Sequence, residues 1–257
     1  KEFKMIKPGQ GKMNRFDLKW PRGVDDNSSF TFAETIVVTK GDVMGVGGEG
    51  NKGKSTFALN LAIENMDDHN VTLVLSENVH RLDERLAHFD WVDIFKPDGG
   101  WKFEVIEARG AAEFLDIARE RPNNLIIFDW LNVTTDSYKV SDFYETLTKL
   151  IDEGVVAVIQ QKRSYKDYVV GGEAALDYSS VFLLLRAGKI EVVKAKVYDY
   201  FDPNDKMYCF DIIKSGSRFT NIHEVYDCPQ CKGKKFYRGE KCGRCYGAGY
   251  LFTLEED

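Results

Sequence analysis

Two groups of residues have the types and spacing that chemistry requires: a glycine-rich stretch at 48–56 and four cysteines between 228 and 245. The stretch fits the phosphate-binding pattern G-x-x-x-x-G-K-[ST]. Its glycines let backbone N–H groups face phosphates, while Lys54 reaches the β- and γ-phosphates and the Ser55 hydroxyl holds Mg²⁺. The alternative is a glycine-rich turn that only connects two elements. The predicted nucleotide-binding residues are Gly48, Glu49, Gly50, Asn51, Lys52, Gly53, Lys54, Ser55 and Thr56.

The residues on both sides of this loop have the patterns that a phosphate site needs. Residues 42–46 form a short apolar run, which predicts a buried strand, and apolar residues recur at helical spacing through 57–62. The glycines would then lie at a turn from a strand into a helix. There the free N–H groups and the dipole of the helix favour a bound phosphate.

A nucleotide hydrolase also needs carboxylates, and two candidates follow predicted strands. Asp129 ends the apolar run 125–128, as in a Walker B strand that delivers an acid to Mg²⁺. Glu77 follows the run 71–76 and is a candidate general base for the attacking water. Strands of a parallel sheet end at one edge, where ligands bind. Each acid also has a plainer interpretation, Asp129 as the cap of its strand and Glu77 as a surface residue.

The cysteines form two C-x-x-C pairs, Cys228 with Cys231 and Cys242 with Cys245. Four thiolates can surround one tetrahedral Zn²⁺ and leave no open position, which predicts a structural metal site. Reduced thiols without metal and redox pairs are the alternatives. The pairs resemble both DnaJ-type zinc modules and small zinc ribbons, and two pairs instead of four favour the ribbon. Cys209, inside the apolar run 207–210, is expected to be buried.

The cysteine segment is basic although the chain carries a net charge of −6. Between Cys228 and Cys245 there is one acid, Glu240, against six cations: Lys232, Lys234, Lys235, Arg238, Lys241 and Arg244. Together with Phe236, Tyr237 and Tyr246, these cations suit contact with DNA or RNA. A docking site for a protein partner is equally open at this point.

Strand-like and helix-like runs alternate from residue 36 onward, which indicates a mostly parallel sheet covered by helices. After residue 180 the pattern changes to antiparallel strands, and residues 1–35 form an irregular lead-in anchored by Phe16, Leu18 and Trp20. The expected strands are 42–46, 71–76, 102–107, 124–129, 155–160, 181–186, 190–198 and 208–214, and the expected helices are 54–67, 79–88, 110–120 and 141–153.

The composition sets further bounds. A hydrophobic content of 43% in 257 residues supports a packed core, and no apolar run approaches the roughly eighteen residues of a membrane span. The first thirty residues lack the apolar core of a secretory signal. We therefore predict a cytoplasmic protein, in the host cytoplasm if it is viral, with no membrane partner. Because the chain begins at Lys1, we expect either a trimmed chain or a piece of a longer protein, and whether a further N-terminal domain exists stays open.

The order of these motifs resembles the RecA-type ATPase core, and more specifically the DnaB-like replicative helicase branch and its phage-type relatives. The resemblance covers residues 35–215 and rests on the loop at 48–56, Ser76-Glu77, Asp129 and Gln160-Gln161. It implies that Glu77 is the catalytic glutamate and that Gln161 senses the γ-phosphate. Lys194 and Lys196 resemble the Lys-x-Arg pair that reaches the nucleotide site of a neighbouring subunit. This chain departs from the family in having lysine where the arginine stands.

The resemblance also implies a loop that lines a central channel and binds single-stranded DNA. The candidate residues are Lys162, Arg163, Tyr165, Lys166 and Tyr168. Cations suit phosphates and tyrosines suit base stacking. An ordinary solvated loop is the alternative.

The sequence thus predicts an α/β, RecA-like domain at 36–222, between the lead-in at 1–35 and a zinc-ribbon-like module at 223–257. Its expected function is that of a DNA-dependent ATPase, helicase-like or a recombination or replication factor, with ATP, Mg²⁺ and Zn²⁺ as ligands. The expected partners are single-stranded DNA, further copies in a hexamer or filament, and a replication or recombination protein. The alternative is a nucleotide-gated assembly or adaptor module that recruits a protein through the zinc tail.

Overall fold

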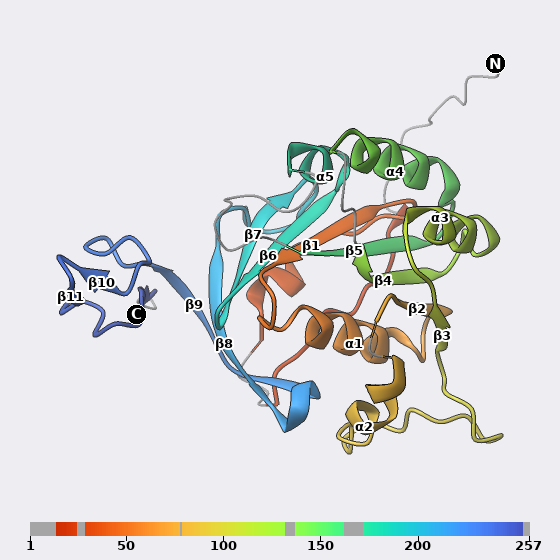
Figure 1. The fold of residues 1–257 in the computed structure, drawn as a ribbon, viewed down its shortest axis with the longest axis horizontal. Coiled ribbons are helices and arrows are strands. Elements are labelled where there is room, and N and C mark those ends of the chain that lie inside the picture. Colours follow the sequence, from red (N-terminus) through yellow and green to blue (C-terminus); the bar gives the residue numbers. More distant parts are fainter. Residues whose placement is uncertain (1–13, 25–28, 78, 132–136, 162–171, 254–257) are drawn as a thin grey trace.

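The computed structural model describes residues 14–24, 29–77, 79–131, 137–161 and 172–253 (Figure 1). Ten strands of this part of the chain form one sheet in the order β12-β9-β8-β7-β6-β1-β5-β4-β2-β3. The neighbouring pairs from β6 to β3 are parallel, and those from β6 to β12 are antiparallel. The chain is therefore α/β, with a large, mostly parallel sheet extended by antiparallel strands, as predicted.

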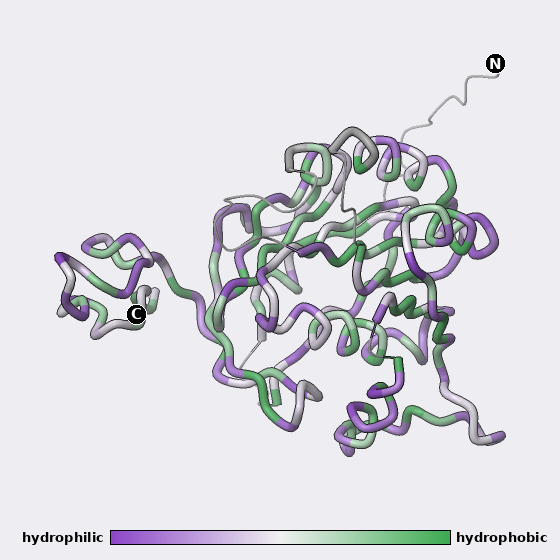
Figure 2. The backbone as a smooth tube through the Cα atoms, in the orientation of Figure 1, coloured by the Kyte–Doolittle hydropathy of each residue, from purple (hydrophilic) through white to green (hydrophobic). Residues whose placement is uncertain are grey.

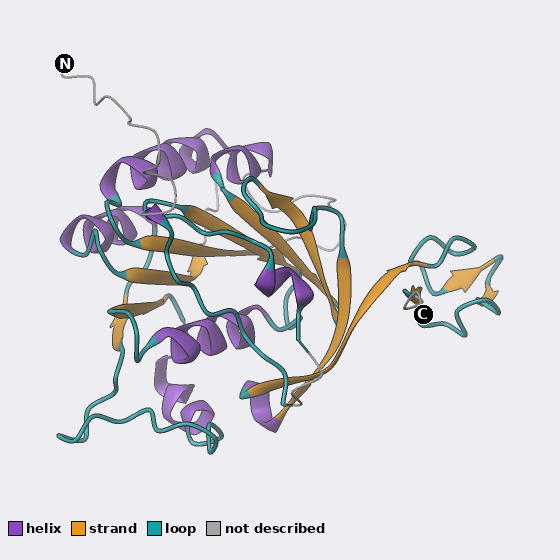
Figure 3. Ribbon diagram, turned by 180° about the vertical axis from the view of Figure 1, so that it is seen from behind, coloured by secondary structure: helices purple, strands orange, loops and turns teal. Residues whose placement is uncertain are grey.

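The parallel part consists of β1 (Val43–Gly48), β2 (Val71–Leu75), β3 (Glu104–Glu107), β4 (Leu125–Leu131), β5 (Val155–Gln161) and β6 (Val181–Arg186). The helices between these strands are α1 (Lys54–Asn65), α2 (Leu82–Leu86), α3 (Ala111–Glu120), α4 (Ser137–Leu150) and α5 (Gly172–Tyr178). Helices α1 and α2 cover one face of the sheet, and α3, α4 and α5 cover the other (Figures 1 and 3).

Successive residues of the central strands pack into two different cores because side chains alternate between the faces of a sheet. In β4, Leu125 and Ile127 belong to the core that includes Phe57 of α1, whereas Ile126 and Phe128 face the core of α3 and α4. Every residue from 125 to 129 is buried. This double burial explains the near-continuous apolar strands, which Figure 2 shows as green stretches in the centre of the molecule.

The antiparallel part consists of β7 (Lys189–Ala195), β8 (Met207–Ile213), β9 (Arg218–Asp227) and β12 (Tyr250–Phe252). Strand β9 was not predicted. Its buried residues are Phe219, Ile222 and Val225, and it crosses the expected domain boundary at 222/223 without interruption. It leads into a small C-terminal lobe, residues 228–253, in which β10 (Phe236–Tyr237) pairs with β11 (Glu240–Lys241). Figure 1 shows this lobe projecting from the body at the end of β9.

The lead-in is tied to the body, as its aromatic residues suggested. Phe16 and Trp20 are buried, and Leu18 packs against the same core. Further along, Phe30 and Phe32, the latter in the 3-10 turn η2 (Thr31–Glu34), stack on each other and contact Tyr208 of β8 edge to face. Phe30 also contacts Phe219 of β9. These rings fasten the β8–β9 hairpin to the rest of the sheet.

Several predicted boundaries were wrong. The expected helix at 79–88 consists of a 3-10 turn, η3 (Val79–Arg81), followed by the short helix α2, and the strand expected at 102–107 begins only at Glu104. Helix α4 begins at Ser137, four residues before the expected start, and ends at Leu150. No helix in the part of the chain that the structure describes is long and apolar enough to cross a membrane.

Candidate functional site

The glycine-rich loop lies between the end of β1 and the start of α1. Gly48 has no room for a side chain, since a Cβ there would lie 2.7 Å from the carbonyl oxygen of Leu185. Asn51 and Gly53 have φ values of 56° and 92°, the left-handed conformation that glycine and asparagine tolerate best. Helix α1 begins at Lys54, with Gly53 as its N-cap. The loop therefore delivers the free N–H groups of a helix N-terminus to the carboxyl edge of the sheet.

The Lys54 side chain lies back over the loop, and its Nζ donates a hydrogen bond to the carbonyl oxygen of Glu49 at 2.6 Å. Partial burial lowers the pKa of Lys54, although the negative charges of Asp129, Glu49 and Glu77 oppose this change. All three acids act on the same ammonium group. The loop lysine and both predicted acids are thus neighbours, although they come from three separate parts of the chain.

Asp129 is buried at the carboxyl end of β4. Its side chain faces a small pocket whose polar lining residues are Ser55, Glu77, Arg85 and Asp129. The Ser55 hydroxyl hydrogen-bonds to the carboxyl group, whereas the Oδ1 atom of Asp129 has no partner among the described atoms. Burial raises the pKa of Asp129, and Ser55 and the charges of Arg85 and Lys54 act in the opposite direction. A hydroxyl beside an unsatisfied carboxylate oxygen is a donor set that suits a hard cation such as Mg²⁺.

Glu77 reaches this pocket because the ends of β2 and β4 are bonded together. The Ser76 N–H donates to the carbonyl of Asp129 at 3.0 Å, and the Trp130 N–H donates to the Ser76 hydroxyl at 3.2 Å. Glu77 follows directly and is exposed, so its carboxylate is open to water while Asp129 is not. Two acids with such different solvation can serve different chemical roles.

Arg85 of α2 is a pocket residue that the sequence reasoning missed. It is partly buried, and this burial lowers the pKa of its guanidinium, while the charge of Asp129 acts in the opposite direction. Its neighbours Leu82 and Leu86 are buried in the core on the same face of α2. The helical spacing i, i+3, i+4 from Leu82 could have identified an inward-facing cation, because a cation between two core leucines points toward the protein.

The other residues of the predicted nucleotide site lie on different sides of the loop. Gln161 of β5 pairs with Gly48 of β1. Its amide nitrogen would lie 3.8 Å from a Cβ if Gly50 carried one, so the Gln161 side chain is next to the loop. Thr56 is 8% exposed. Its hydroxyl would lie 2.7 Å from a Cβ if Gly216 carried one, so Thr56 faces the β8–β9 turn.

Lys194 and Lys196 lie away from this pocket. Lys194 pairs with Phe182 at the start of β6. The glycine-rich loop follows the end of β1, and β1 is parallel to β6, so Lys194 and the loop lie at opposite ends of these strands. The Lys194 Nζ donates to the carbonyls of Leu176 and Asp177 at the end of α5. Lys196 is exposed. Within one chain, therefore, these lysines are not brought together with the loop residues.

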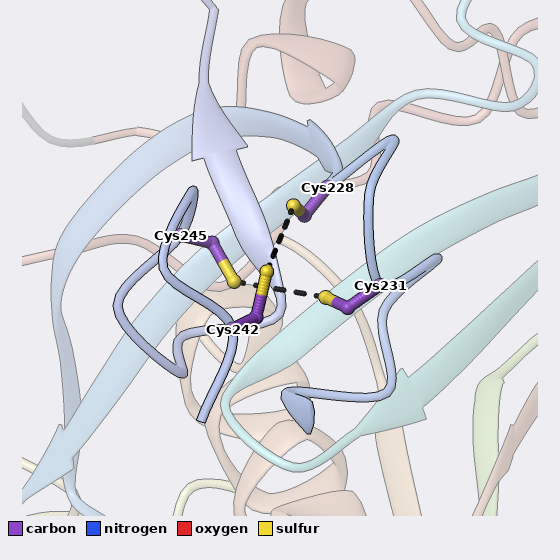
Figure 4. A group of neighbouring side chains, drawn as sticks. All are labelled: Cys228, Cys231, Cys242 and Cys245. Carbon is purple, nitrogen blue, oxygen red and sulfur yellow. Dashed lines mark hydrogen bonds between the residues drawn. The ribbon is translucent and has the colours of Figure 1, made fainter. Parts of the chain in front are cut away.

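The four paired cysteines converge in the C-terminal lobe (Figure 4). Their sulfur atoms all lie within 4.8 Å of one another, with 3.9 Å between Cys228 and Cys242 and 3.6 Å between Cys231 and Cys245. Zinc–sulfur bonds of about 2.3 Å in a tetrahedron give sulfur–sulfur edges of about 3.8 Å, whereas a disulfide requires about 2.05 Å. All four thiols are free and buried, so this group could hold a metal ion such as zinc.

The surroundings of the sulfurs differ. Burial, followed by the contact with Cys245, raises the pKa of Cys231. Burial acts the same way on Cys245, but hydrogen bonds that include the Gly249 N–H, at 3.3 Å from the sulfur, outweigh it and lower its pKa. Cys209 lies outside this group, buried in β8, where burial raises the pKa of its thiol.

The predicted DNA-binding residues Lys162, Arg163, Tyr165, Lys166 and Tyr168 lie outside the described residues.

Among family models no match to this chain is found, and no curated protein matches it either.

We predict that Asp129→Asn raises the thermal stability of the ligand-free protein at neutral pH. A pKa raised by folding means that the charged carboxylate costs stability above that pKa, and the cost disappears as the pH falls below the ordinary value of 3.8. The melting temperature should rise by a few degrees, since about 1 kcal/mol corresponds to about 2–4 °C in a chain of this size. Differential scanning calorimetry from neutral to acidic pH measures the difference, which should shrink on acidification.

Glu77→Gln is the matched control because Glu77 is exposed and its charge costs little. An Asp129→Asn protein that melts below the wild type at neutral pH would show that Lys54 and Arg85 more than compensate the burial of the carboxylate.

We predict that Cys242→Ser prevents metal uptake by the C-terminal lobe, while Cys209→Ser leaves it intact. Only Cys242 belongs to the group of converging sulfurs, and a missing thiolate opens the coordination sphere. Elemental analysis of protein purified with zinc should give about one ion per chain for the wild type and the Cys209 variant. Equal metal content in all three proteins would contradict the assignment.

Proposed function

We propose that this chain is a RecA-like P-loop ATPase of the DnaB-like helicase branch, with a zinc ribbon at its C-terminal end. The observation that carries the proposal is the pocket beside the glycine-rich loop, which is lined by Ser55, Glu77, Arg85 and Asp129. A loop that fits the phosphate-binding pattern could be a simple turn. A turn alone has no need of a buried carboxylate, an exposed carboxylate and a cation at the same edge.

The topology supports the same conclusion. The strand that precedes the loop, β1, lies between β5 and β6, and β5 carries Gln161 beside the loop. Strands β4 and β2 follow. Asp129 pairs with Leu75 near the end of β4, and Glu77 comes two residues after the end of β2. Glu77, Asp129 and Gln161 thus come from the carboxyl ends of neighbouring parallel strands, which is where open α/β sheets bind ligands.

In the proposed reaction the protein binds ATP through the loop N–H groups and the Lys54 ammonium. Ser55 and Asp129 would hold Mg²⁺, which would supply positive charge to the phosphate oxygens. Glu77, which is exposed to water, accepts a proton from the attacking water molecule. Arg85 adds a fixed positive charge at this edge, and Gln161, which lies beside Gly50, senses the γ-phosphate.

The remaining elements of the proposal concern partners. ATP would bind between subunits of a hexamer or filament, with the exposed Lys196 of one copy reaching the loop of the next. The segment around Lys162 and Arg163 would contact single-stranded DNA. The four cysteines would hold a structural Zn²⁺.

We predict that Lys54→Ala abolishes ATP binding and every nucleotide-dependent function, whereas Glu77→Gln binds ATP but does not turn it over. Loss of the general base should reduce kcat by about 10²–10⁴-fold. A fluorescent ATP analogue measures binding, and phosphate release measures turnover. Lys40→Ala is the control, because Lys40 pairs with Glu153 away from the loop. Full hydrolysis by the Glu77 variant would remove the assignment of the base.

We also predict that single-stranded DNA stimulates the ATPase activity and that the combined change Lys162→Ala, Arg163→Ala and Tyr165→Ala removes the response. Steady-state rates with and without DNA, together with the mass of the oligomer, measure this. A protein that assembles with nucleotide but shows no stimulation would instead be a nucleotide-gated assembly or adaptor module.

A further inference from the structure

The C-terminal lobe exposes aromatic rings that a small domain would be expected to bury. Phe236 is 61% exposed, Tyr237 40% and Tyr246 81%. The interior of the lobe consists of the four cysteines with Ala248 and Leu251 packed against them. Because the interior is built from these residues, the aromatic rings remain on the surface. Several large exposed rings in a lobe of this size mark a site of interaction.

The same surface is strongly positive. Every residue from 234 to 241 is exposed, and so are the other cations of the lobe, Lys232 and Arg244. Residues 228–253 contain six cations and one acid. None of these cations forms an ion pair within the described residues, and the Arg238 guanidinium lies 5.3 Å from the centre of the Tyr237 ring. The positive charge is thus available to an anionic partner.

Two of the side chains hold matching positions in the two cysteine knuckles. Lys232 and Tyr246 each follow the second cysteine of a pair, with φ values of 50° and 49°, and each precedes a glycine with φ of 78°. This left-handed backbone is unfavourable for lysine and tyrosine and persists only where the surroundings impose it. The knuckles therefore hold a cation and a ring at fixed points of the surface.

The short β10–β11 hairpin presents the other rings. Its turn, Arg238-Gly239, has φ values of 52° and 84°, as in the primed turns that join paired strands tightly. Phe236 and Tyr237 precede the turn. The Tyr237 ring thus lies beside Arg238, and the Phe236 ring, one residue earlier in the strand, faces the other side of the hairpin.

The lobe is also fastened to the body. Strand β12 pairs with β9, and Lys189 of β7 forms an ion pair with Asp227 at 2.8 Å and lies 5.8 Å from the centre of the Tyr250 ring. The lobe therefore has a defined position at the end of β9, away from α1 and α2 (Figure 1).

We propose that Phe236, Tyr237, Tyr246 and the surrounding cations bind single-stranded nucleic acid. Rings can stack only on bases whose faces are free, and the cations bind the phosphates between them. A duplex offers no free base faces to this surface. The binding does not depend on the nucleotide pocket, so it can be tested without ATP.

The test uses the zinc-loaded full chain with Lys162, Arg163 and Tyr165 replaced by alanine, so that the segment at 162–168 does not contribute. Fluorescence anisotropy measures its binding to oligothymidylate of about thirty nucleotides, to oligouridylate and to a duplex. We expect both single strands to bind at least about tenfold more tightly than the duplex. Phe236→Ala and Tyr246→Asn should each weaken single-strand binding roughly tenfold, since stacking on one ring contributes about 1–3 kcal/mol.

The variants separate binding from folding. Asparagine tolerates the left-handed backbone at 246, so Tyr246→Asn should keep its zinc content and melting temperature. Tyr246→Phe keeps the ring and should keep the affinity. Phe95→Ala removes another exposed ring, 51% exposed and far from the lobe in sequence, and should have no effect. Unchanged affinity of the Phe236 and Tyr246 variants, equal affinity for duplex, or no binding of single strands would overturn the proposal, the last result favouring a protein partner.

Discussion

The buried carboxylate of Asp129 is the constraint on which the rest of the site depends. A charge that is 6% exposed is costly unless cations and hydrogen-bond donors surround it. Here the compensating groups are Ser55 and Lys54 from α1 and Arg85 from α2. Since they belong to different elements, the site exists only while both helices keep their places against the sheet.

The β8–β9 hairpin helps to hold these helices. At its tip is the 3-10 turn η4 (Lys214–Gly216), whose Gly216 carbonyl accepts a hydrogen bond from the buried Asn60 of α1 at 2.9 Å. Lys214 pairs with Asp90, and the Arg218 guanidinium lies 4.3 Å from the centre of the Trp91 ring, both just after α2. The same strand, β9, then leads to the cysteine lobe. The β8–β9 hairpin thus contacts residues of α1 and residues just after α2, near the pocket, and its second strand leads to the four cysteines.

The two parts of the chain are stabilised in different ways. The body buries apolar side chains on both faces of a sheet, whereas the lobe has too few residues for such a core and gathers four sulfurs instead. A metal ion held by these sulfurs would replace the hydrophobic core, and the aromatic and basic side chains of the lobe face solvent. The surface chemistry of the lobe follows from the chemistry of its interior.

The sequence by itself determined the elements with strong local signals. The loop at 48–56, the buried strands that end near Asp129 and Gln161, and the two cysteine pairs are short-range patterns of glycine, apolar residues and spacing. Only the tertiary structure showed that Arg85 lines the pocket, that Thr56 faces the β8–β9 turn, and that β9 runs on into the lobe. These features arise from contacts between residues distant in sequence, and local patterns carry no information about which distant side chains will meet.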